Sequence, residues 1–580
     1  MDDKVTGATL TVRAVAGLHV VFLAWDFTNG LPDSAGSDLL GFAIEREEFD
    51  ATGAVVERYM LRGIKRFKDK DEGLDPGTPV PTDEHPIQSF QWGDYTVHPA
   101  TRYRFRVIPV YGKPKLLRLA DDQAVTIDIG TLAEVGSVAG TGVRHDIYFN
   151  RGVAGSQAFV RRFKSQYIVD GKFTADQNDT TIEPMQWLSR GLFEGLRSFL
   201  ASATGSSYSL KAMLYEFHYL PAAQLFKEAA SRGVQVDIRY EAQSYREENE
   251  ATIAAAQLDN VCSPQPSRSG IRHNKFVVLL KDGHPKAVWT GSTNLSVGGI
   301  FGHSNVGHAV WDEAIADRYD QYWNALTAPG VKAQALRKAA LNPPFGCATP
   351  ADLPPSGEVL TLFSPRDPAS KDKPAVTLEW YASLIGRAGE VACLTLPFNF
   401  DETLKRAVAV QNDVLRMIVM DKKLSDEEEE EIRVDHDTLI AAGSKLDTGD
   451  LRCFSREFLT GFNRNNYIHD KFLLIDPHGE DPIVITGSAN FSGPSQREND
   501  ENMLVIRGDK RVAHIYFGEF LRIFDHFYAR YLAEKMKRLG TGDPDAGYLK
   551  KTTADWLDGH RAGYKAKRRQ YFVNPVRTVH

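Results

Sequence analysis

The sequence HNKFVVLL (His273–Leu280), followed by VWTGSTNLS (Val288–Ser296), recurs later in the chain as HDKFLLID (His469–Asp476) and IVITGSANFS (Ile483–Ser492). Each copy has an HxK sequence at the start of an apolar strand and a GSxN sequence at the end of the next strand. Since residues i and i+2 of a strand point to the same face, each HxK places an imidazole beside an ammonium group. The repetition predicts two similar halves whose motifs face each other.

Strand-like and helical sequences alternate before each copy. The first such unit consists of KAMLYEFHY (Lys211–Tyr219), the helical PAAQLFKEAASRG and VQVDIRYEA. The same order is repeated by VACLTLPFNF (Val391–Phe400), DETLKRAVAV and VLRMIVMDK. A strand, a helix and a strand in this order predict a right-handed crossover between two parallel strands. We therefore expect two α/β domains over residues 145–340 and 355–535, joined by a linker rich in Pro and Gly.

The first 130 residues have a different pattern. Residues 8–25 and YRFRVIPVYG alternate apolar and polar side chains with a period of two, between clusters of Gly, Pro and Asp, which predicts an all-β sandwich over residues 1–130. Trp25 in an early strand and HPATRYRFRVIPVYG (His98–Gly112) resemble a fibronectin type III module, in which a tyrosine at the place of Tyr103 often forms a corner. Residues 536–580 are expected to be a helical, basic tail.

Length and composition exclude several classes of protein. A chain of 580 residues with 42% hydrophobic and 25% charged residues is expected to form several cores of a soluble globular protein. Neither a secretory signal nor a run of 18 apolar residues is found, so we expect a cytoplasmic protein without a transmembrane segment, and export by a route without a signal stays open. The cysteines form no CxxC pair, which predicts neither a zinc site nor a disulfide framework.

The two motif copies contain the groups that phosphodiester cleavage needs. One neutral histidine can attack phosphorus while the other, as imidazolium, protonates the leaving oxygen. Lysine and asparagine side chains can hold the non-bridging oxygens, so no metal or other cofactor is implied. The predicted catalytic residues of the two motif copies are His273, Lys275, Asn294, His469, Lys471 and Asn490, and the predicted substrate-binding residues are Ser292 and Ser488.

These residues resemble the phospholipase D superfamily, in which HxK, four residues, Asp, a spacer and GSxN occur twice around a pseudo-twofold axis. The resemblance covers residues 145–535 and implies a phosphohistidine intermediate, formed in most members on the first-copy histidine, here His273. Asp476 matches the motif aspartate, but Leu280 stands at that place in the first copy. We therefore expect this aspartate to have a structural role.

The resemblance also implies a carboxylate that orients a catalytic histidine. In many members it follows the motif asparagine by about 11 residues, and Glu501 has this spacing. The resemblance therefore implies that Glu501 is a further catalytic residue, and we expect it beside His469. The first copy has Asn305 at the equivalent place, which predicts an orienting group that is neutral or comes from elsewhere.

The motif predicts binding of a phosphate group, but it does not distinguish a phospholipid substrate from a nucleic acid. A net charge of −7 slightly favours a phospholipid, with Val297–Gly302 as an apolar loop for peripheral membrane contact or, alternatively, a buried glycine turn. A nuclease would need a basic, aromatic track, for which Arg161–Lys164, Phe462–Tyr467 and His560–Gln570 are candidates. An inactive phosphate-binding scaffold is disfavoured, because every HxK and GSxN residue is present in both copies. Transfer to an alcohol instead of water, and protein or glycan contact through the sandwich, stay open.

Overall fold

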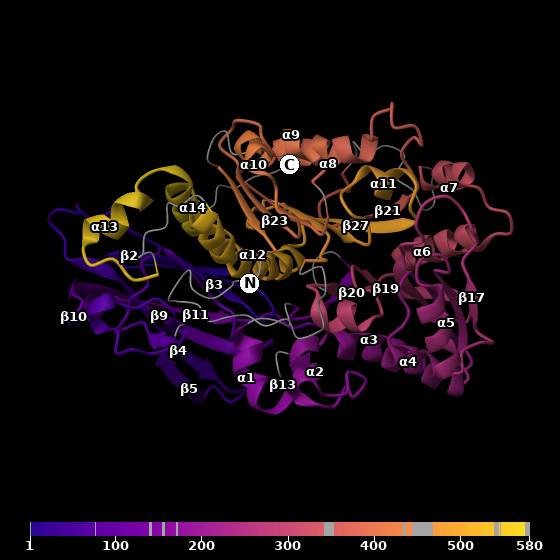
Figure 1. The fold of residues 1–580 in the computed structure, drawn as a ribbon, viewed down its shortest axis with the longest axis horizontal. Helices are drawn as coiled ribbons and strands as arrows, with labels where there is room; N and C mark the ends of the chain where they lie inside the picture. Colours follow the sequence, from indigo (N-terminus) through magenta and orange to yellow (C-terminus); the bar gives the residue numbers. More distant parts are fainter. Residues whose placement is uncertain are drawn as a thin grey trace.

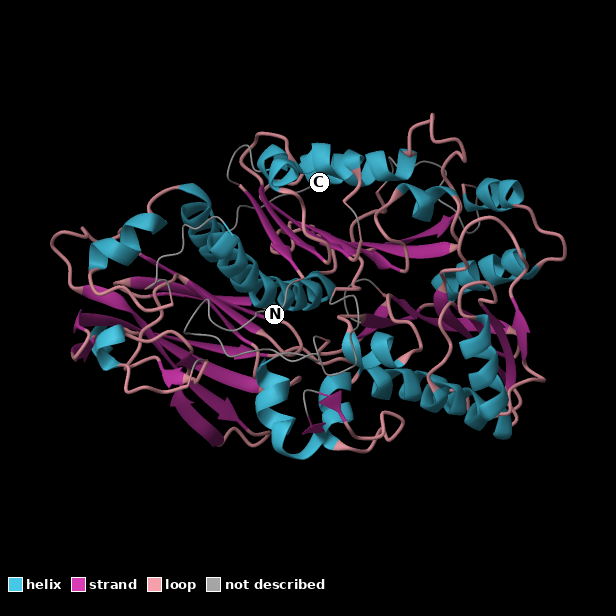
Figure 2. Cartoon of the chain, viewed as in Figure 1, coloured by secondary structure: helices cyan, strands magenta, loops and turns pink. Residues whose placement is uncertain are grey.

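Two antiparallel sheets come first along the chain, and two mixed sheets flanked by helices follow (Figures 1 and 2). This arrangement confirms the predicted fold class. The computed structural model describes residues 2–574 except 76, 139–141, 153–156, 170–171, 342–352, 399, 433–436, 444–467, 539–544 and 546.

The N-terminal sheets pack face to face as a sandwich. One has the order β1-β2-β3-β8, and the other has the order β10-β9-β4-β5 with β11 paired to β9. The Tyr103 hydroxyl accepts a hydrogen bond from the His98 N–H at 2.8 Å, which is the predicted corner contact. The narrower resemblance to a fibronectin type III module stays a prediction. The strands are β1 (Asp2–Thr6), β2 (Leu10–Ala16), β3 (Val21–Phe27), β4 (Leu39–Phe49), β5 (Val55–Met60), β6 (Arg62–Gly63), β7 (Val80–Pro81), β8 (Gln91–Asp94), β9 (Arg102–Lys113), β10 (Leu116–Leu119) and β11 (Val125–Gly130).

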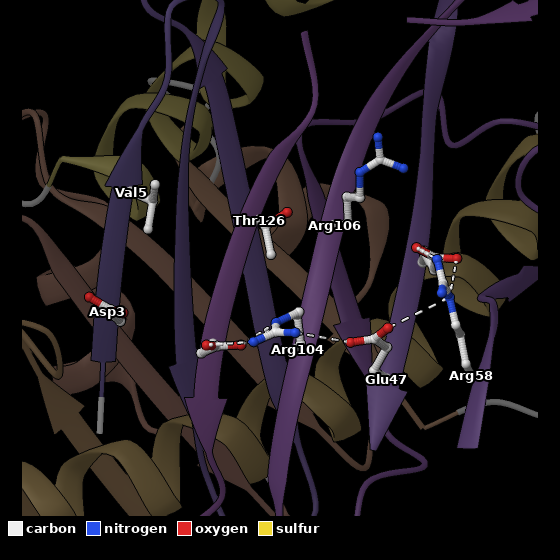
Figure 3. A pocket seen from close by; sticks show the side chains of 9 residues that line it. Asp3, Val5, Glu47, Arg58, Arg104, Arg106 and Thr126 are labelled. Carbon is white, nitrogen blue, oxygen red and sulfur yellow. Dashed lines mark hydrogen bonds and ion pairs between the residues drawn. The ribbon is translucent and has the colours of Figure 1, made fainter. Parts of the chain in front are cut away.

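The outer face of the second of these sheets carries a shallow hollow lined by alternating charges (Figure 3). Arg104 lies 2.8 Å from Asp128 and 3.3 Å from Glu47, and Glu47 lies 3.6 Å from Arg58. Exposed ion pairs of this kind contribute only about 0–1 kcal/mol each. None of the HxK or GSxN residues lines this hollow, so it is separate from the predicted site.

The first half of the α/β region, residues 144–340, contains a seven-stranded sheet of order β12-β20-β19-β18-β15-β16-β17. Strands β15 and β16 are parallel and joined by α4, as the sequence predicted. The elements are β12 (Arg144–Phe149), α1 (Gln157–Tyr167), β13 (Ile168–Val169), β14 (Lys172–Phe173), α2 (Glu183–Ser189), α3 (Leu192–Ala201), β15 (Tyr208–Leu214), α4 (Leu220–Ser231), β16 (Gln235–Tyr240), α5 (Arg246–Ala255), β17 (Cys262–Pro264), β18 (Lys275–Lys281), β19 (His284–Gly291), β20 (Val306–Trp311), α6 (Glu313–Thr327) and α7 (Ala333–Ala340).

The second half, residues 359–538, repeats this topology with the order β21-β27-β26-β25-β22-β23-β24. Strands β22 and β23 form the second parallel pair, joined by α9. The elements are β21 (Val359–Ser364), α8 (Val376–Gly386), β22 (Val391–Leu396), α9 (Glu402–Val408), β23 (Leu415–Met420), α10 (Asp426–Ile432), β24 (Thr438–Ala442), β25 (Phe472–Ile475), β26 (Ile483–Gly487), α11 (Gly493–Arg497), β27 (Glu501–Arg507) and α12 (Lys510–Arg538).

The apolar run after the first HxK divides its side chains between two cores. Val277 and Leu279 pack under α3 and α4, whereas Phe276 and Val278 enter a core that the two halves share. Burial on both faces explains why the run is continuously apolar instead of alternating. The strand that starts each motif is therefore held rigidly from both sides.

The sandwich and the C-terminal residues also join the shared core. Phe22 of β3 lies 5.0 Å from Phe572, measured between ring centroids, and both belong to the core that contains much of α12. Helix α12 runs through the middle of the molecule, and α13 (Thr553–Leu557) and α14 (Gly563–Val573) return to the sandwich (Figure 1). Trp556 enters the sandwich core itself. The domain boundaries stay predictions. No helix in the described part of the chain has the length and apolar character needed to cross a bilayer.

Candidate functional site

The segments that lead into the two HxK sequences pair with the opposite half. Arg272 forms a parallel bridge with Asp500, and Ile468 forms one with Ser304. The His273 N–H donates to the Asp500 carbonyl, and the His469 N–H donates to the Ser304 carbonyl, each at 3.2 Å. These bonds bring both motif copies to the interface between the halves, as the sequence predicted.

Each motif histidine hydrogen-bonds to a side chain from the opposite half. His273 Nδ1 lies 2.8 Å from Glu501 Oε2, and His469 Nδ1 lies 2.9 Å from Asn305 Oδ1. The Asn305 amide nitrogen donates to the Gly299 carbonyl at 2.8 Å, so its oxygen faces the ring and accepts the Nδ1 proton. With Nδ1 engaged in this way, Nε2 of each ring points away from its partner and is the atom available for chemistry.

The expected position of Glu501 beside His469 is therefore wrong. Glu501 directly follows Asp500, whose backbone pairs with the first half, and its side chain consequently reaches His273. The equivalent group for His469 is Asn305, which is the neutral alternative that the sequence left open.

The glycines of the two GSxN sequences allow close contact with the neighbouring strand. A Cβ atom on Gly291 would lie 2.3 Å from the Val306 carbonyl oxygen, and one on Gly487 would lie 2.2 Å from the Asn502 carbonyl oxygen. No real side chain tolerates such distances, so both positions require glycine. The turn that carries each motif asparagine is fixed by this contact.

The motif serines hold the residues that orient the histidines. Ser292 Oγ donates to Asn305 Oδ1 at 2.8 Å, and Ser488 Oγ donates to Glu501 Oε2 at 2.7 Å. Each hydroxyl also accepts a backbone N–H, and both residues are completely buried. The structure thus gives both serines a positioning role, and their contact with substrate stays a prediction.

The motif lysines are buried and bonded in the same way in both halves. Lys275 Nζ donates to the His273 carbonyl at 2.6 Å, and Lys471 Nζ donates to the His469 carbonyl at 2.7 Å. Burial lowers the pKa of Lys275 to about 8, and burial together with the nearby Lys275 charge holds the pKa of Lys471 well below its usual value. Two lysine side chains in one buried space favour binding of an anion, which in turn stabilises their protonated forms.

The two histidines differ in the charge around them. Burial lowers the pKa of His273, and the Glu501 carboxylate acts against that effect by stabilising the imidazolium. Burial, Lys471 and His303 hold the pKa of His469 well below its usual value, and its partner Asn305 adds no negative charge. His273 is therefore the ring whose cationic form the protein stabilises directly.

The motif asparagines have neighbours that the sequence did not reveal. Asn294 Nδ2 donates to Glu216 Oε1 at 2.6 Å. The Tyr215 ring lies 4.8 Å from the His273 ring and 4.9 Å from Lys275 Nζ. The position of Tyr215 and Glu216 directly after parallel strand β15 was the available signal, because ligands bind beyond the carboxyl ends of such strands. Asn490 lies in the equivalent turn of the second half.

Asp476 has the structural role expected from the sequence. Its carboxylate accepts hydrogen bonds from the backbone N–H groups of Gly389, Glu390 and Val391 at 2.7–2.9 Å. It follows β25, at the opposite end of that strand from Lys471. Leu280 can therefore replace it in the first copy without removing a group from the site.

The structure describes some of the segments that the sequence suggested for contact with a lipid or a nucleic acid. Val297–Gly302 is a buried turn in which Phe301 has no exposed surface, so it is not an apolar loop at a membrane interface. In Arg161–Lys164, Arg162 pairs with Glu183 on the surface. Phe462–Tyr467 lies outside the described residues.

The basic segment His560–Gln570 is bonded to acidic groups of its own chain. Lys567 pairs with Asp413 and Asp437, and Arg569 pairs with Asp26. This segment therefore links the sandwich to the second half. Across the described part of the chain, the His, Cys, Asp and Glu side chains form no group of three or more suited to holding a metal ion.

Comparisons with known proteins agree with this geometry. A family model described as "Cardiolipin synthase, PLD-like domain" matches residues 401–524. Mitochondrial cardiolipin hydrolase of Canis lupus familiaris is 32% identical over 79 residues, which is 13% of this chain and 29% of that relative, so the match spans less than a third of the relative's length.

The chain also has weak similarity to several solved structures. Phosphatidylserine synthase of Haemophilus influenzae has 12% identity and a TM-score of 0.41, over 61% of this chain and 92% of that chain. The phospholipase D family member Nuc of Salmonella typhimurium has 15% identity and a TM-score of 0.20, over 29% of this chain and 94% of that chain. The matching PLD-like domain and the two complete sets of HxK and GSxN residues make this chain similar to the phospholipase D superfamily, whose members are phosphodiesterases.

Proposed function

We propose that this protein is a phosphodiesterase that works through a phosphohistidine on His273, with a phospholipid as its substrate. The observation that carries the proposal is the crossed pairing of the histidines, in which His273 bonds to Glu501 and His469 bonds to Asn305. This pairing gives the two rings different electrostatic environments, as a nucleophile and an acid require.

In the first step, Nε2 of neutral His273 attacks phosphorus, and the bond from phosphorus to the leaving oxygen breaks. The ring becomes cationic when the new bond from nitrogen to phosphorus forms, and Glu501 stabilises that charge through Nδ1–H. His469, protonated on Nε2 once the anionic phosphate is bound, gives this proton to the leaving oxygen. Its low basicity makes it a ready donor.

In the second step, Nε2 of the now neutral His469 takes a proton from water. The water oxygen attacks phosphorus, the bond to His273 breaks, and the phosphomonoester leaves. Lys275 and Lys471 hold the non-bridging oxygens through both steps, together with the amides of Asn294 and Asn490. These groups supply the charge stabilisation without a metal.

A phospholipid is favoured as substrate by the names of the matched family and relative. The model that matches residues 401–524 is named after cardiolipin synthase, and the curated relative is a cardiolipin hydrolase. Cardiolipin contains two phosphodiesters, so either fits the proposed chemistry.

The test uses the purified protein in excess EDTA against cardiolipin vesicles, phosphatidylcholine vesicles and single-stranded DNA, with His273→Asn as the matched control. We expect release of a phosphomonoester from lipid by the wild type and not by the variant. Cleavage of DNA alone would replace the lipid by a nucleic acid. Activity that EDTA abolishes and a divalent ion restores would contradict the metal-independent mechanism.

A further inference from the structure

A third histidine lies in the site at a place where the two halves differ. His303 directly precedes Ser304, and in the second half Asn499 directly precedes Asp500. Ser304 and Asp500 are the residues whose carbonyls accept the N–H of His469 and His273 across the interface. His303 and Asn499 therefore occupy equivalent positions next to the two catalytic rings.

Asn499 has a structural role that occupies its side chain. Its Oδ1 accepts the Ile271 N–H at 3.0 Å, and its Nδ2 donates to Glu501 Oε1 at 3.4 Å. The His303 ring has no hydrogen bond of this kind within the described residues, and although most of the residue is buried, part of its surface is exposed. The hydrogen bonds of its side chain therefore explain the presence of Asn499. No such bonds in the described part of the chain explain the presence of an imidazole at His303.

The backbone holds His303 firmly beside His469. The His303 N–H donates to the Gly298 carbonyl at 2.8 Å, and the His303 carbonyl accepts from Asn150 Nδ2 at 2.7 Å. A Cβ atom on Gly152 would lie within 2.9 Å of this backbone, so glycine is required for the close packing. The two ring centroids are 5.8 Å apart, a separation at which both rings can reach one oxygen atom.

The environment of His303 keeps its ring neutral. Burial lowers the pKa of His303 to about 4, with Lys471 acting in the same direction and the Glu216 carboxylate acting against it. A neutral imidazole offers one N–H donor and one acceptor nitrogen. It can therefore hydrogen-bond an alcohol or a water molecule without competing for the proton on His469.

We propose that His303 is a third catalytic histidine, which hydrogen-bonds the leaving alcohol and then the attacking water beside His469. This role rests on the proposed function. The proton that the leaving oxygen receives still comes from Nε2 of His469, and the His303 N–H stabilises the negative charge that develops on that oxygen before the transfer is complete. An alkoxide carries much of this charge, whereas nitrophenolate disperses it over its ring.

The test compares phosphatidylethanol with phosphatidyl-p-nitrophenol, which share one phosphoryl group and differ in the leaving alcohol. We expect His303→Ala, which removes the donor, to lower kcat/KM for the ethyl ester at least about tenfold more than for the nitrophenyl ester, because loss of one charge-stabilising donor costs about 10²–10³-fold where the charge is localised. His303→Gln, which keeps an N–H donor, should recover part of this difference. The ratio of the two rates within one preparation does not depend on the fraction of folded protein.

Asn499→Ala is the matched control, because it changes the equivalent residue of the other half. It should affect both esters equally. Equal effects of His303→Ala on the two esters, or no effect on either, would overturn the role of His303 while leaving the proposed function intact. If the wild type cleaves neither ester, the proposed function fails and the role of His303 fails with it.

Discussion

The two halves share a sheet order and a motif, yet they surround their histidines differently. His273 is paired with a carboxylate, Glu501, whereas His469 is paired with an amide, Asn305, and has His303 beside it. Lysines and glycines, by contrast, make equivalent contacts in both halves. The repeated motif thus places equivalent phosphate-binding groups in both halves. The residues outside the motif give the two histidines different environments, one suited to a nucleophile and the other to an acid.

Exchange of either histidine for asparagine should produce the largest effect and separate the two roles. We expect turnover to fall by about 10³–10⁴-fold or more in both variants. With a p-nitrophenyl diester, which hardly needs an acid, His469→Asn should accumulate phosphate label on His273, because the base for water activation is also missing. His273→Asn should accumulate none.

The label is followed by its acid lability and alkali stability and located by peptide mass spectrometry. Label on His469 in the His273→Asn variant would reverse the assignment. No label in either folded variant would argue against a covalent intermediate.

Exchange of the orienting groups tests whether they cause the asymmetry. Glu501→Gln removes the charge that stabilises phosphorylated His273, so we expect kcat/KM to fall by about 10²-fold, as for other residues that orient a catalytic ligand. Asn305→Asp adds a carboxylate beside His469, which raises the pKa of that ring and makes it a weaker acid, with an expected loss of about tenfold. Initial rates with an alkyl diester measure both, and equal losses would mean that the pairings are interchangeable.

The lysines should set the alkaline limit of activity. Lys275 is protonated below its pKa of about 8 and neutral above it, so kcat/KM should be steady near pH 7 and decline above pH 8, to about a tenth at pH 9. Arginine stays protonated over this range, so Lys275→Arg should move the decline to higher pH even if its maximum rate is lower. A pH profile with the same alkaline limb in both proteins would assign that limb to another group.

The middle residue of the motif offers a smaller test, on stability. Asp470 is buried, and burial raises its pKa to about 7, whereas its counterpart Asn274 is neutral. Between about pH 4 and pH 7 the folded state keeps a proton that the unfolded state has lost, so stability falls as pH rises through this window. Asp470→Asn has no such titration and should raise the melting temperature by roughly 1–3 °C at pH 8 relative to its effect at about pH 3, where Asp470 of the wild type is largely protonated in both the folded and the unfolded state. Calorimetric scans at both pH values measure the difference.

Local patterns in the sequence predicted most of the fold and of the site. The parallel pairs β15–β16 and β22–β23 and the two motif positions follow from periodicity and spacing within one segment. The structural role of Asp476 is inferred from its replacement by Leu280 in the first copy. The partner of Glu501 does not, because it lies 228 residues away on a surface formed only when the halves dock. Spacing within one half therefore pointed to His469.

The same limit applies to residues without a repeated counterpart. Tyr215 and Glu216 lie at the motif because β15 ends beside it. The spacing of the HxK and GSxN residues does not predict either of them. The shared core was also hidden, since the apolar residues of α12 and α14 are compatible with any buried helix.

Trp556 has a consequence for how the chain is made. It stacks on Phe90 at 5.8 Å and meets the edge of Phe42 at 6.2 Å, so the sandwich that is synthesised first has a gap in its core until a residue more than 400 positions beyond β11 emerges. At 5–20 residues per second, the ribosome needs roughly 20–90 s to cover that distance. During this time Phe42 and Phe90 lack their contact with Trp556, so we expect the nascent sandwich to bind chaperones. Ribosomes that stall near the end of the message should then release an aggregation-prone product, although both HxK motifs are complete.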